Sequence, residues 1–359
     1  MQQKQTIRHV AVDISSHGYG HAAMTAPLIN HLQRLHPKPQ ITLRSTVPLT
    51  FLKSKFNAPF EYLPQSCDIG MMMNSPFEVD RPSTLHGYRQ LHGDWQRQIA
   101  NEKQRLVEIG AEMVISNIAY LPLIAARQLD IPAIAISCLN WADIFGYFFP
   151  AEQTIHQQII AAYQSVSCFI RTEPAMPMAD FTTRTVAPLA TAGSSRRQQL
   201  ITILKLEPET RLVLVSMGGI KSEMDTDHWP LLDGVHYITA SAVATTTRSD
   251  ITLLDEIDIN YSDALCSCDL LLTKPGYGSF TEAACNGIPV LYVRRDEWPE
   301  QPFLTAWLQR QVPCNEITLE QFKKGAFSQP LQRLLQEPIT AAAAASGIEA
   351  ATEIITRYL

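Results

Sequence analysis

Short apolar runs alternate with longer segments of helical periodicity along both halves of the chain. The apolar runs cover residues 8–14, 40–44, 113–116 and 133–137 in the first half, and 211–215, 235–239, 252–257, 269–273 and 289–293 in the second. Helical patterns occupy intervals such as 85–109 and 121–129. This alternation predicts an α/β fold with a doubly wound parallel sheet in each half, which amounts to a weak internal duplication.

One stretch interrupts the alternation and divides the chain. Residues 176–197 are rich in Pro, Thr, Ala and Ser and have little periodicity, which is typical of a linker. We therefore expect an N-terminal Rossmann-like domain over residues 1–175 and a C-terminal Rossmann-like domain over 198–340. An Ala-rich helix over 341–359 is expected to pack back on the N-terminal domain.

Composition narrows the classes of partner and compartment. With 359 residues and 46% hydrophobic content, the chain can bury a core in each of two domains. Only 18% of residues are charged and the net charge is −6, so we expect no nucleic-acid partner. The seven cysteines lack zinc-site spacing and indicate reduced thiols, and no segment reads as a signal peptide or a transmembrane span. These features predict a cytoplasmic protein, and a homodimer is compatible with them.

The stretch that follows the apolar run 269–273 carries the strongest functional signal. Lys274-Pro275-Gly276-Tyr277-Gly278 is followed by Ser279-x-x-Glu282, which predicts a glycine turn and then a helix that begins with a capping box. A turn at the carboxyl edge of a parallel sheet binds anions, because free amides and the positive helix terminus meet there. The sequence therefore predicts a ligand that bears phosphate.

A second glycine loop, His17-Gly18-Tyr19-Gly20-His21, follows the first apolar run. The two histidines are four residues apart, but the glycines between them do not favour a zinc-binding helix face, and we predict no metal site. A histidine in the first helical position stays neutral and can accept a proton. We interpret His21 in this way, and the alternative is a histidine that only caps or packs against the helix.

Taken together, these segments resemble the GT-B nucleotide-sugar glycosyltransferases, particularly the group that contains MurG. A narrower likeness is to the N-terminal glycosyltransferase-like region of plant L-arabinokinases. It is carried by His17–Ala22, Asn140–Asp143, Gly276–Ala283, Val293–Asp296 and Pro302–Leu304. The resemblance implies two domains facing each other across a cleft. It also implies transfer of a sugar from a nucleotide-diphosphate sugar, with UDP as the expected nucleotide, to an unknown acceptor hydroxyl. No kinase activity is implied.

The resemblance also implies roles for individual residues. His21 would be the general base with His17 as its alternative, and Asp143 would orient a histidine or hold the acceptor hydroxyl. Glu282 would accept hydrogen bonds from the ribose hydroxyls. The implied substrate-binding residues are Gly18, Gly20, Ser216, Gly218, Gly219, Lys274, Gly276, Gly278, Ser279, Glu282, Arg295, Asp296 and Gln301. No cofactor is expected, because helix termini and basic side chains can stabilise a leaving diphosphate without a metal.

Alternative interpretations remain open at this point. Glu282 is also the last residue of the predicted capping box, and Arg295 has acidic neighbours with which it would form a loop ion pair. Trp141 would either stack on a sugar or lie in the core. Asp225-Thr226-Asp227 is interpreted as a solvated loop. The competing functions are hydrolysis of a nucleotide sugar in the same cleft and noncatalytic binding of a nucleotide sugar or sugar phosphate.

Overall fold

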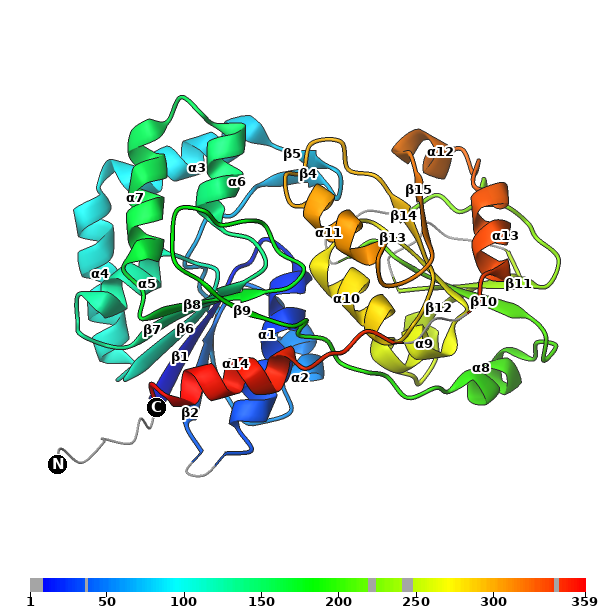
Figure 1. The fold of residues 1–359 in the computed structure, drawn as a ribbon, viewed down its shortest axis with the longest axis horizontal. Coiled ribbons are helices and arrows are strands. Elements are labelled where there is room, and N and C mark those ends of the chain that lie inside the picture. The colour runs from blue at the N-terminus through cyan, green and yellow to red at the C-terminus, as the bar shows by residue number, and fades with distance from the viewer. Residues whose placement is uncertain (1–8, 36–37, 219–223, 241–247, 339–341) are drawn as a thin grey trace. The chain divides into compact units, whose positions relative to one another are not determined.

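The computed structural model describes residues 9–35, 38–218, 224–240, 248–338 and 342–359 (Figure 1). The chain divides into two compact units. Unit 1 comprises Met1–Asn74, Val79–Leu189 and Ser346–Leu359, and unit 2 comprises Ser75–Glu78 and Ala190–Ala345. The residues 176–189, which lie in the stretch expected to be a linker, belong to unit 1 and include a strand at Arg184–Val186.

Unit 1 contains a parallel sheet of seven strands in the order β3-β2-β1-β6-β7-β8-β9. The strands are β1 (His9–Ile14), β2 (Gln40–Arg44), β3 (Glu61–Leu63), β6 (Met113–Asn117), β7 (Ala133–Ser137), β8 (Cys168–Thr172) and β9 (Arg184–Val186). The central strands are buried throughout, because helices cover both faces of the sheet. The order reverses between β1 and β6, so the ends of these two strands form the switch point at which doubly wound sheets bind ligands.

The helices of unit 1 form two groups. They are α1 (Tyr19–Leu32), α2 (Leu49–Lys55), α3 (Arg81–Gly93), α4 (Trp95–Glu108), α5 (Leu121–Arg127), α6 (Trp141–Phe148), α7 (Gln153–Gln164) and α14 (Gly347–Thr356). Helices α1, α2 and α14 pack together, and α3 to α7 form the other group. The segment expected as one helix over 85–109 is two helices that meet at Asp94.

The C-terminal helix is shorter than the Ala-rich sequence predicts. It begins at Gly347, and residues 342–345 are not helical although alanine is the best helix former. The backbone N–H of Ala343 instead donates to the carbonyl oxygen of Ala284 at 3.0 Å, which holds this stretch within unit 2. A side chain at Gly347 would lie 1.9 Å from the carbonyl oxygen of Ala187, so only glycine allows this close approach.

Unit 2 repeats the arrangement of unit 1. Its six parallel strands have the order β12-β11-β10-β13-β14-β15, which matches the first six strands of unit 1 and confirms the internal duplication. They are β10 (Arg211–Ser216), β11 (Val235–Thr239), β12 (Ile251–Leu253), β13 (Leu270–Thr273), β14 (Val290–Val293) and β15 (Cys314–Ile317). The helices are α8 (Arg197–Leu204), α9 (Tyr261–Ser267), α10 (Tyr277–Cys285), α11 (Gln301–Leu308), α12 (Leu319–Lys323) and α13 (Ser328–Gln336), with a 3₁₀ turn at Leu254–Glu256. Here the switch point lies between β10 and β13.

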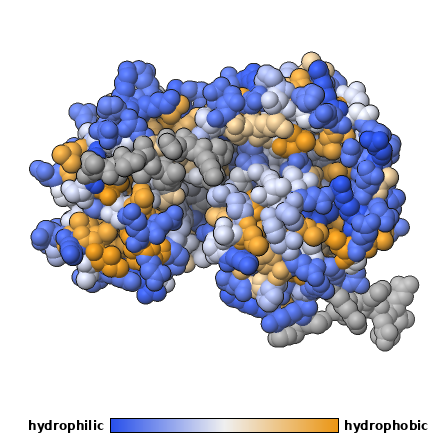
Figure 2. Space-filling view, turned by 180° about the vertical axis from the view of Figure 1, so that it is seen from behind, coloured by the Kyte–Doolittle hydropathy of each residue, from blue (hydrophilic) through white to orange (hydrophobic). Residues whose placement is uncertain are grey.

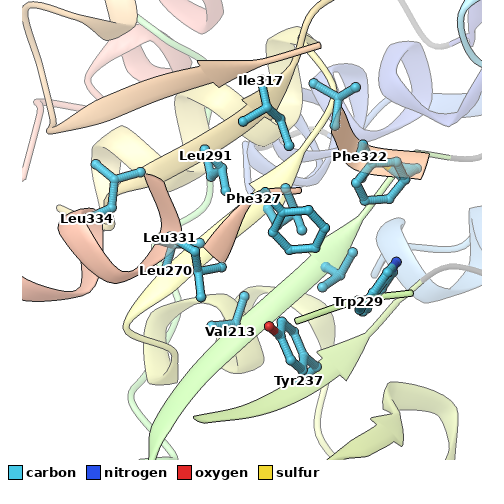
Figure 3. Close-up of a cluster of buried hydrophobic side chains, with 14 of the residues drawn as sticks. Val213, Trp229, Tyr237, Leu270, Leu291, Ile317, Phe322, Phe327, Leu331 and Leu334 are labelled. Carbon is cyan, nitrogen blue, oxygen red and sulfur yellow. The ribbon is translucent and has the colours of Figure 1, made fainter. Parts of the chain in front are cut away.

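An apolar core packs against the unit 2 sheet (Figure 3). Leucines of α13 and the rings of Phe322, Phe327 and Trp229 cover side chains of β10, β11, β13 and β14. Phe77 packs on the same cluster and lies between β4 (Met73–Ser75) and β5 (Glu78–Val79), which pair as a small sheet. The segment 64–83, which we expected to be a long loop, therefore contains two short strands.

A buried ion-pair network holds the carboxyl end of β1. Arg44 pairs with Asp13 at 2.7 Å and with Glu102 at 2.6 Å, and all three side chains are at most 1% exposed. Burial raises the pKa of the Glu102 carboxyl, against the opposing charge of Arg44. Asp13 lies two residues before Ser15, so the network fixes the start of the loop that carries His17 and leads into the helix of His21.

The surface and the helices show how the molecule meets its solvent. In the view of Figure 2, hydrophilic side chains are spread over the surface, with smaller hydrophobic patches between them. Within the described residues, no helix has the length and apolar character needed to cross a bilayer.

Candidate functional site

The loop after β1 leads directly into α1, whose first residue is Tyr19. His21 is therefore the third residue of the helix and not the first, as the sequence suggested, and its side chain is buried with 7% exposure. Side chains added at Gly18 or Gly20 would meet no atom within 4 Å. The described residues therefore leave open space above both predicted glycines.

Asn117, at the end of β6, holds the His21 ring, and the sequence did not identify it. Its Nδ2 donates to the carbonyl oxygen of His21 at 3.3 Å and lies 3.0 Å from Thr25 Oγ1. Because a backbone carbonyl can only accept, the Asn117 Oδ1 must face the ring, where it lies 2.9 Å from His21 Nδ1. His21 therefore carries its proton on Nδ1 and presents the Nε2 lone pair, which is the arrangement that a general base requires.

His17 lies beside His21 but is tied to another segment. Its Nδ1 lies 2.8 Å from the carbonyl oxygen of Met71, to which it can donate, and its ring centroid is 6.3 Å from that of His21. Gly70 has φ +60°, and a side chain there would approach His17 Cβ to 3.1 Å. The His17 ring is thus fixed by the segment around Gly70.

Trp141 and Asp68 lie beside the two histidines in unit 1. Trp141 is fully buried, so the core interpretation is correct and its ring presents no face for sugar stacking. Its Nε1 donates to Asp68 Oδ2 at 2.8 Å. Burial raises the pKa of Asp68. Hydrogen bonds from Ser15 and Trp141, together with the nearby His21, act in the opposite direction. Asp68 is a carboxyl group near the predicted base that no sequence motif indicated.

Asp143 lies at the start of α6 and is engaged by Asn140, the N-cap of that helix. The Asn140 Nδ2 donates to Asp143 Oδ2 at 2.8 Å, and the Asp143 backbone N–H donates to Asn140 Oδ1 at 2.8 Å. Burial raises the pKa of Asp143, opposed by the Asn140 hydrogen bond. The Asp143 carboxylate is thus held by Asn140, and the side chain that orients the His21 ring is Asn117.

In unit 2, the turns after β10 and β13 lie next to each other at the switch point. Thr273 Oγ1 donates to the carbonyl oxygen of Ser216 at 2.6 Å. Gly218 has φ +80°, and a side chain there would lie 3.2 Å from Cε of Lys274. The structure thus brings Ser216, Gly218 and Lys274 together, while the predicted residue Gly219 lies outside the described residues.

Helix α10 begins earlier than the sequence indicated. Its first residue is Tyr277 and its N-cap is Gly276, so Ser279 is not the cap and the expected capping box is absent. The early start follows from packing, because the Tyr277 side chain is buried and Phe280 N–H donates to the Gly276 carbonyl oxygen. No side chain caps this terminus, and an added side chain would meet nothing within 4 Å at Gly278. The terminus therefore has the features of an anion site.

Tyr261 of α9 lies between residues that were predicted to bind the phosphate and the ribose of the ligand. Its buried hydroxyl lies near the hydroxyls of Ser216 and Ser279 and near the Glu282 carboxylate. Burial and the negative charge of Glu282 raise the pKa of Tyr261. Glu282 is half-buried and lies in the second turn of α10. Ser216, Ser279 and Glu282 are thus gathered around one tyrosine, which the sequence did not single out.

The segment after β14 contains a buried arginine and an exposed one. Arg295 is 6% exposed, and its guanidinium lies 4.1 Å from the centroid of the Trp298 ring. Its backbone N–H donates to Gln301 Oε1 at 2.8 Å. Arg294, and not Arg295, pairs with Asp296, whose side chain is 73% exposed. The alternative interpretation, in which Arg295 forms an ion pair with an acidic neighbour in the loop, is therefore wrong.

No metal site emerges from the described parts of the chain. They contain no group of three or more His, Cys, Asp or Glu side chains placed to hold a metal ion. Asp225 and Asp227 are exposed, as expected for a solvated loop, and the Asp227 backbone N–H donates to Asp225 Oδ1 at 2.9 Å.

The sequence of the chain was compared with family models and with curated proteins. No family model matches the chain. The L-arabinokinase of Arabidopsis thaliana is 23% identical over 327 residues, a match that covers 89% of this chain and 31% of the plant protein. The chain thus spans about a third of the length of this curated relative. The resemblance to arabinokinases that the motifs indicated is confirmed.

Solved glycosyltransferases share the fold over nearly the whole chain. MurG of Acinetobacter baumannii superposes with a TM-score of 0.55 at 12% identity and covers 98% of this chain and 99% of its own. The glycosyltransferase UGT89C1 of Arabidopsis thaliana, solved in complex with UDP, has a TM-score of 0.55 at 12% identity, with coverage of 97% and 99%. Similarity at this level of identity concerns the fold. The chain therefore has the GT-B fold, with a doubly wound parallel sheet in each of its two units.

Proposed function

We propose that the protein transfers a sugar from a nucleotide-diphosphate sugar, with UDP as the nucleotide, to an acceptor hydroxyl in the cytoplasm. The observation that carries this proposal is the uncapped N-terminus of α10 at the switch point of unit 2. The open space above Gly278 leaves room for a diphosphate against the first amides of the helix. A glycosyltransferase of the same fold has been solved with UDP, which supports the choice of nucleotide.

The remaining groups of unit 2 fit the other parts of such a donor. The Glu282 carboxylate is placed one helical turn beyond the anion site and would accept hydrogen bonds from the two ribose hydroxyls. Ser216 and Gly218, at the end of β10, would form the other wall of the phosphate site. In this proposal the nucleotide is bound by unit 2, and the acceptor hydroxyl is bound by unit 1.

In the proposed reaction, His21 acts as the general base. Its Nε2 would take the proton of the acceptor hydroxyl while the acceptor oxygen forms a bond to the anomeric carbon. The bond from that carbon to the diphosphate oxygen breaks, and UDP leaves with the electron pair. The α10 terminus and nearby basic side chains would stabilise the charge on the leaving diphosphate, so the proposal requires no metal.

Gly278→Ala is expected to separate binding from folding. Gly278 is the second residue of α10 and a side chain there has free space, so alanine should leave stability unchanged or raise it by up to about 1 kcal/mol. The new methyl group would hold a diphosphate away from the amides. We therefore expect normal urea unfolding together with an affinity for UDP at least about tenfold weaker, or about 1.4 kcal/mol. If the variant unfolds at a lower urea concentration than the wild type, or binds UDP as tightly, Gly278 does not have the proposed role at the diphosphate.

A turnover assay decides between the proposed transfer and its competitors. The protein is incubated with a panel of nucleotide sugars, with and without a panel of acceptor alcohols and glycans, and UDP release is followed. Release that depends on an acceptor, with a glycosylated product, supports transfer. Release at the same rate without any acceptor identifies a hydrolase, and tight binding with no release identifies a binding protein.

A further inference from the structure

Two basic side chains meet at the ends of neighbouring strands in unit 2. Lys274 follows β13 directly, Arg295 lies two residues after β14, and these strands pair in parallel. Arg295 is 6% exposed and Lys274 is half-buried. The two cations are close enough to repel each other, and Glu300 is the acidic group that acts on both.

Neither cation has an acidic partner at ion-pair distance among the described residues. Arg295 Nε is buried and has no hydrogen-bond partner. Glu300, for its part, accepts a hydrogen bond from Trp298 Nε1 at 2.9 Å. Two like charges without close counter-ions, one buried and one half-buried, destabilise a fold, because each loses hydration and repels the other. A ligand that supplies the opposite charge would offset this cost.

The surroundings favour an oxyanion at this place. The Arg295 guanidinium lies over the Trp298 ring, 4.1 Å from its centroid, so the side chain is restrained before any ligand arrives. Gly218, with φ +80°, packs closely against the Lys274 side chain, where a bulkier residue would displace it. The uncapped N-terminus of α10 lies two residues beyond Lys274. The buried, unpartnered Arg295 Nε is an observation independent of this helix terminus.

We propose that Lys274 and Arg295 form a paired receptor for one oxyanion group of the ligand. In the context of the proposed function, on which this assignment rests, that group is either the diphosphate of the nucleotide or a carboxylate on the donated sugar. Arg295 would bind two oxygens of the anion with its fork, and Lys274 would act as a point charge. The Trp298 and Gln301 contacts hold Arg295 in position for this role.

The protonation of Lys274 makes the receptor sensitive to pH. Burial, and then the charge of Arg295, lowers the pKa of Lys274 to about 7, while Glu300 acts in the opposite direction. A bound anion favours the charged lysine, so binding takes up a proton when the pH lies above this value. Affinity for the anion should therefore fall as the pH rises from about 7 towards 9, and titrations in buffers of different ionisation enthalpy should show the proton uptake.

The test compares Lys274→Met and Arg295→Met with Arg294→Gln, an exposed arginine on the same segment that already has acidic partners. Without ligand, both methionine variants should melt higher than the wild type by about 2–4 °C, because an uncompensated buried charge is gone. A purely structural role for these side chains would lower the melting temperature instead, which would overturn the proposal. Arg294→Gln should behave as the wild type does.

Ligand probes then identify the anion. Inorganic phosphate, glucuronate, UDP, UDP-glucose and UDP-glucuronate are each added to the wild type and to the three variants. A UDP shift that is lost in both methionine variants assigns the diphosphate to the pair. A larger shift with UDP-glucuronate than with UDP-glucose, lost in the same variants, assigns the carboxylate.

The proposed function and the oxyanion pair fail in different ways. If the nucleotides shift both methionine variants as strongly as the wild type, the pair is not the receptor although the donor site stands. If no nucleotide binds but phosphate or glucuronate does, and the variants lose that shift, the pair stands and the donor assignment falls. If no probe shifts the wild type at pH 6 and millimolar concentration, the pair is not an oxyanion receptor.

Discussion

Replacing His21 with alanine is expected to lower the turnover of the donor by about 10²–10⁴-fold, the usual contribution of a general base. The Nε2 lone pair is the group that would take the acceptor proton, and Asn117 fixes the orientation of the ring by accepting from its Nδ1. Nucleotide binding should be unchanged, because the residues assigned to the nucleotide belong to unit 2. The measurement is steady-state UDP release beside calorimetric titration with UDP.

His31→Ala is the matched control for this prediction. His31 lies in the last turn of the same helix, so the substitution tests whether any loss of histidine from α1 has the same effect. We expect this control to retain its turnover. Full activity in His21→Ala would remove His21 from the mechanism, and loss of nucleotide binding together with turnover would indicate damage to the fold.

Glu282→Ala is expected to weaken UDP binding by about 10–100-fold, because hydrogen bonds to a charged group contribute about 1.5–3 kcal/mol. The effect should depend on the ribose. With 2′-deoxy-UDP, the wild type loses one of the two hydroxyl contacts, while Glu282→Ala has already lost both. The two changes should therefore be far from additive in a double-mutant cycle measured by titration calorimetry.

Glu320→Ala provides the control for unit 2. Glu320 is an exposed carboxylate on α12 that pairs with Lys324, so its removal changes the charge of the unit by the same amount. UDP affinity should be unchanged in this variant. Equal losses in both variants would mean that Glu282 acts through overall charge, and additive losses for Glu282→Ala and 2′-deoxy-UDP would contradict contact with the ribose.

The architecture could be predicted from the sequence because it depends on local patterns. Apolar runs such as 211–215 and 269–273 coincide with strands, since a strand of a parallel sheet is buried on both faces. The glycine turns lie where predicted because they follow those strands. The exact start of α10 was missed, because the burial of Tyr277 is a tertiary effect that outweighs the capping preference of Ser279.

The partners of the site residues could not be predicted in the same way. Asn117 is 96 residues from His21, and the two meet because β1 pairs with β6. Asp68 lies in a segment without periodicity, so nothing local indicated that it would reach Trp141. Tyr261 was passed over for a similar reason, since its neighbours come from the turn after β10 and from α10. The strand order at the switch point, which places the end of β6 beside the end of β1, is the signal that could have indicated Asn117.

The central claim is that the first turn of α10 binds a nucleoside diphosphate. A crystal structure of the full chain with UDP at millimolar concentration tests it most directly. We expect the diphosphate against the backbone amides that follow Gly276, with the ribose hydroxyls at hydrogen-bond distance from Glu282. A nucleotide bound elsewhere in the molecule, or a terminus that remains empty while UDP is bound, would contradict the account.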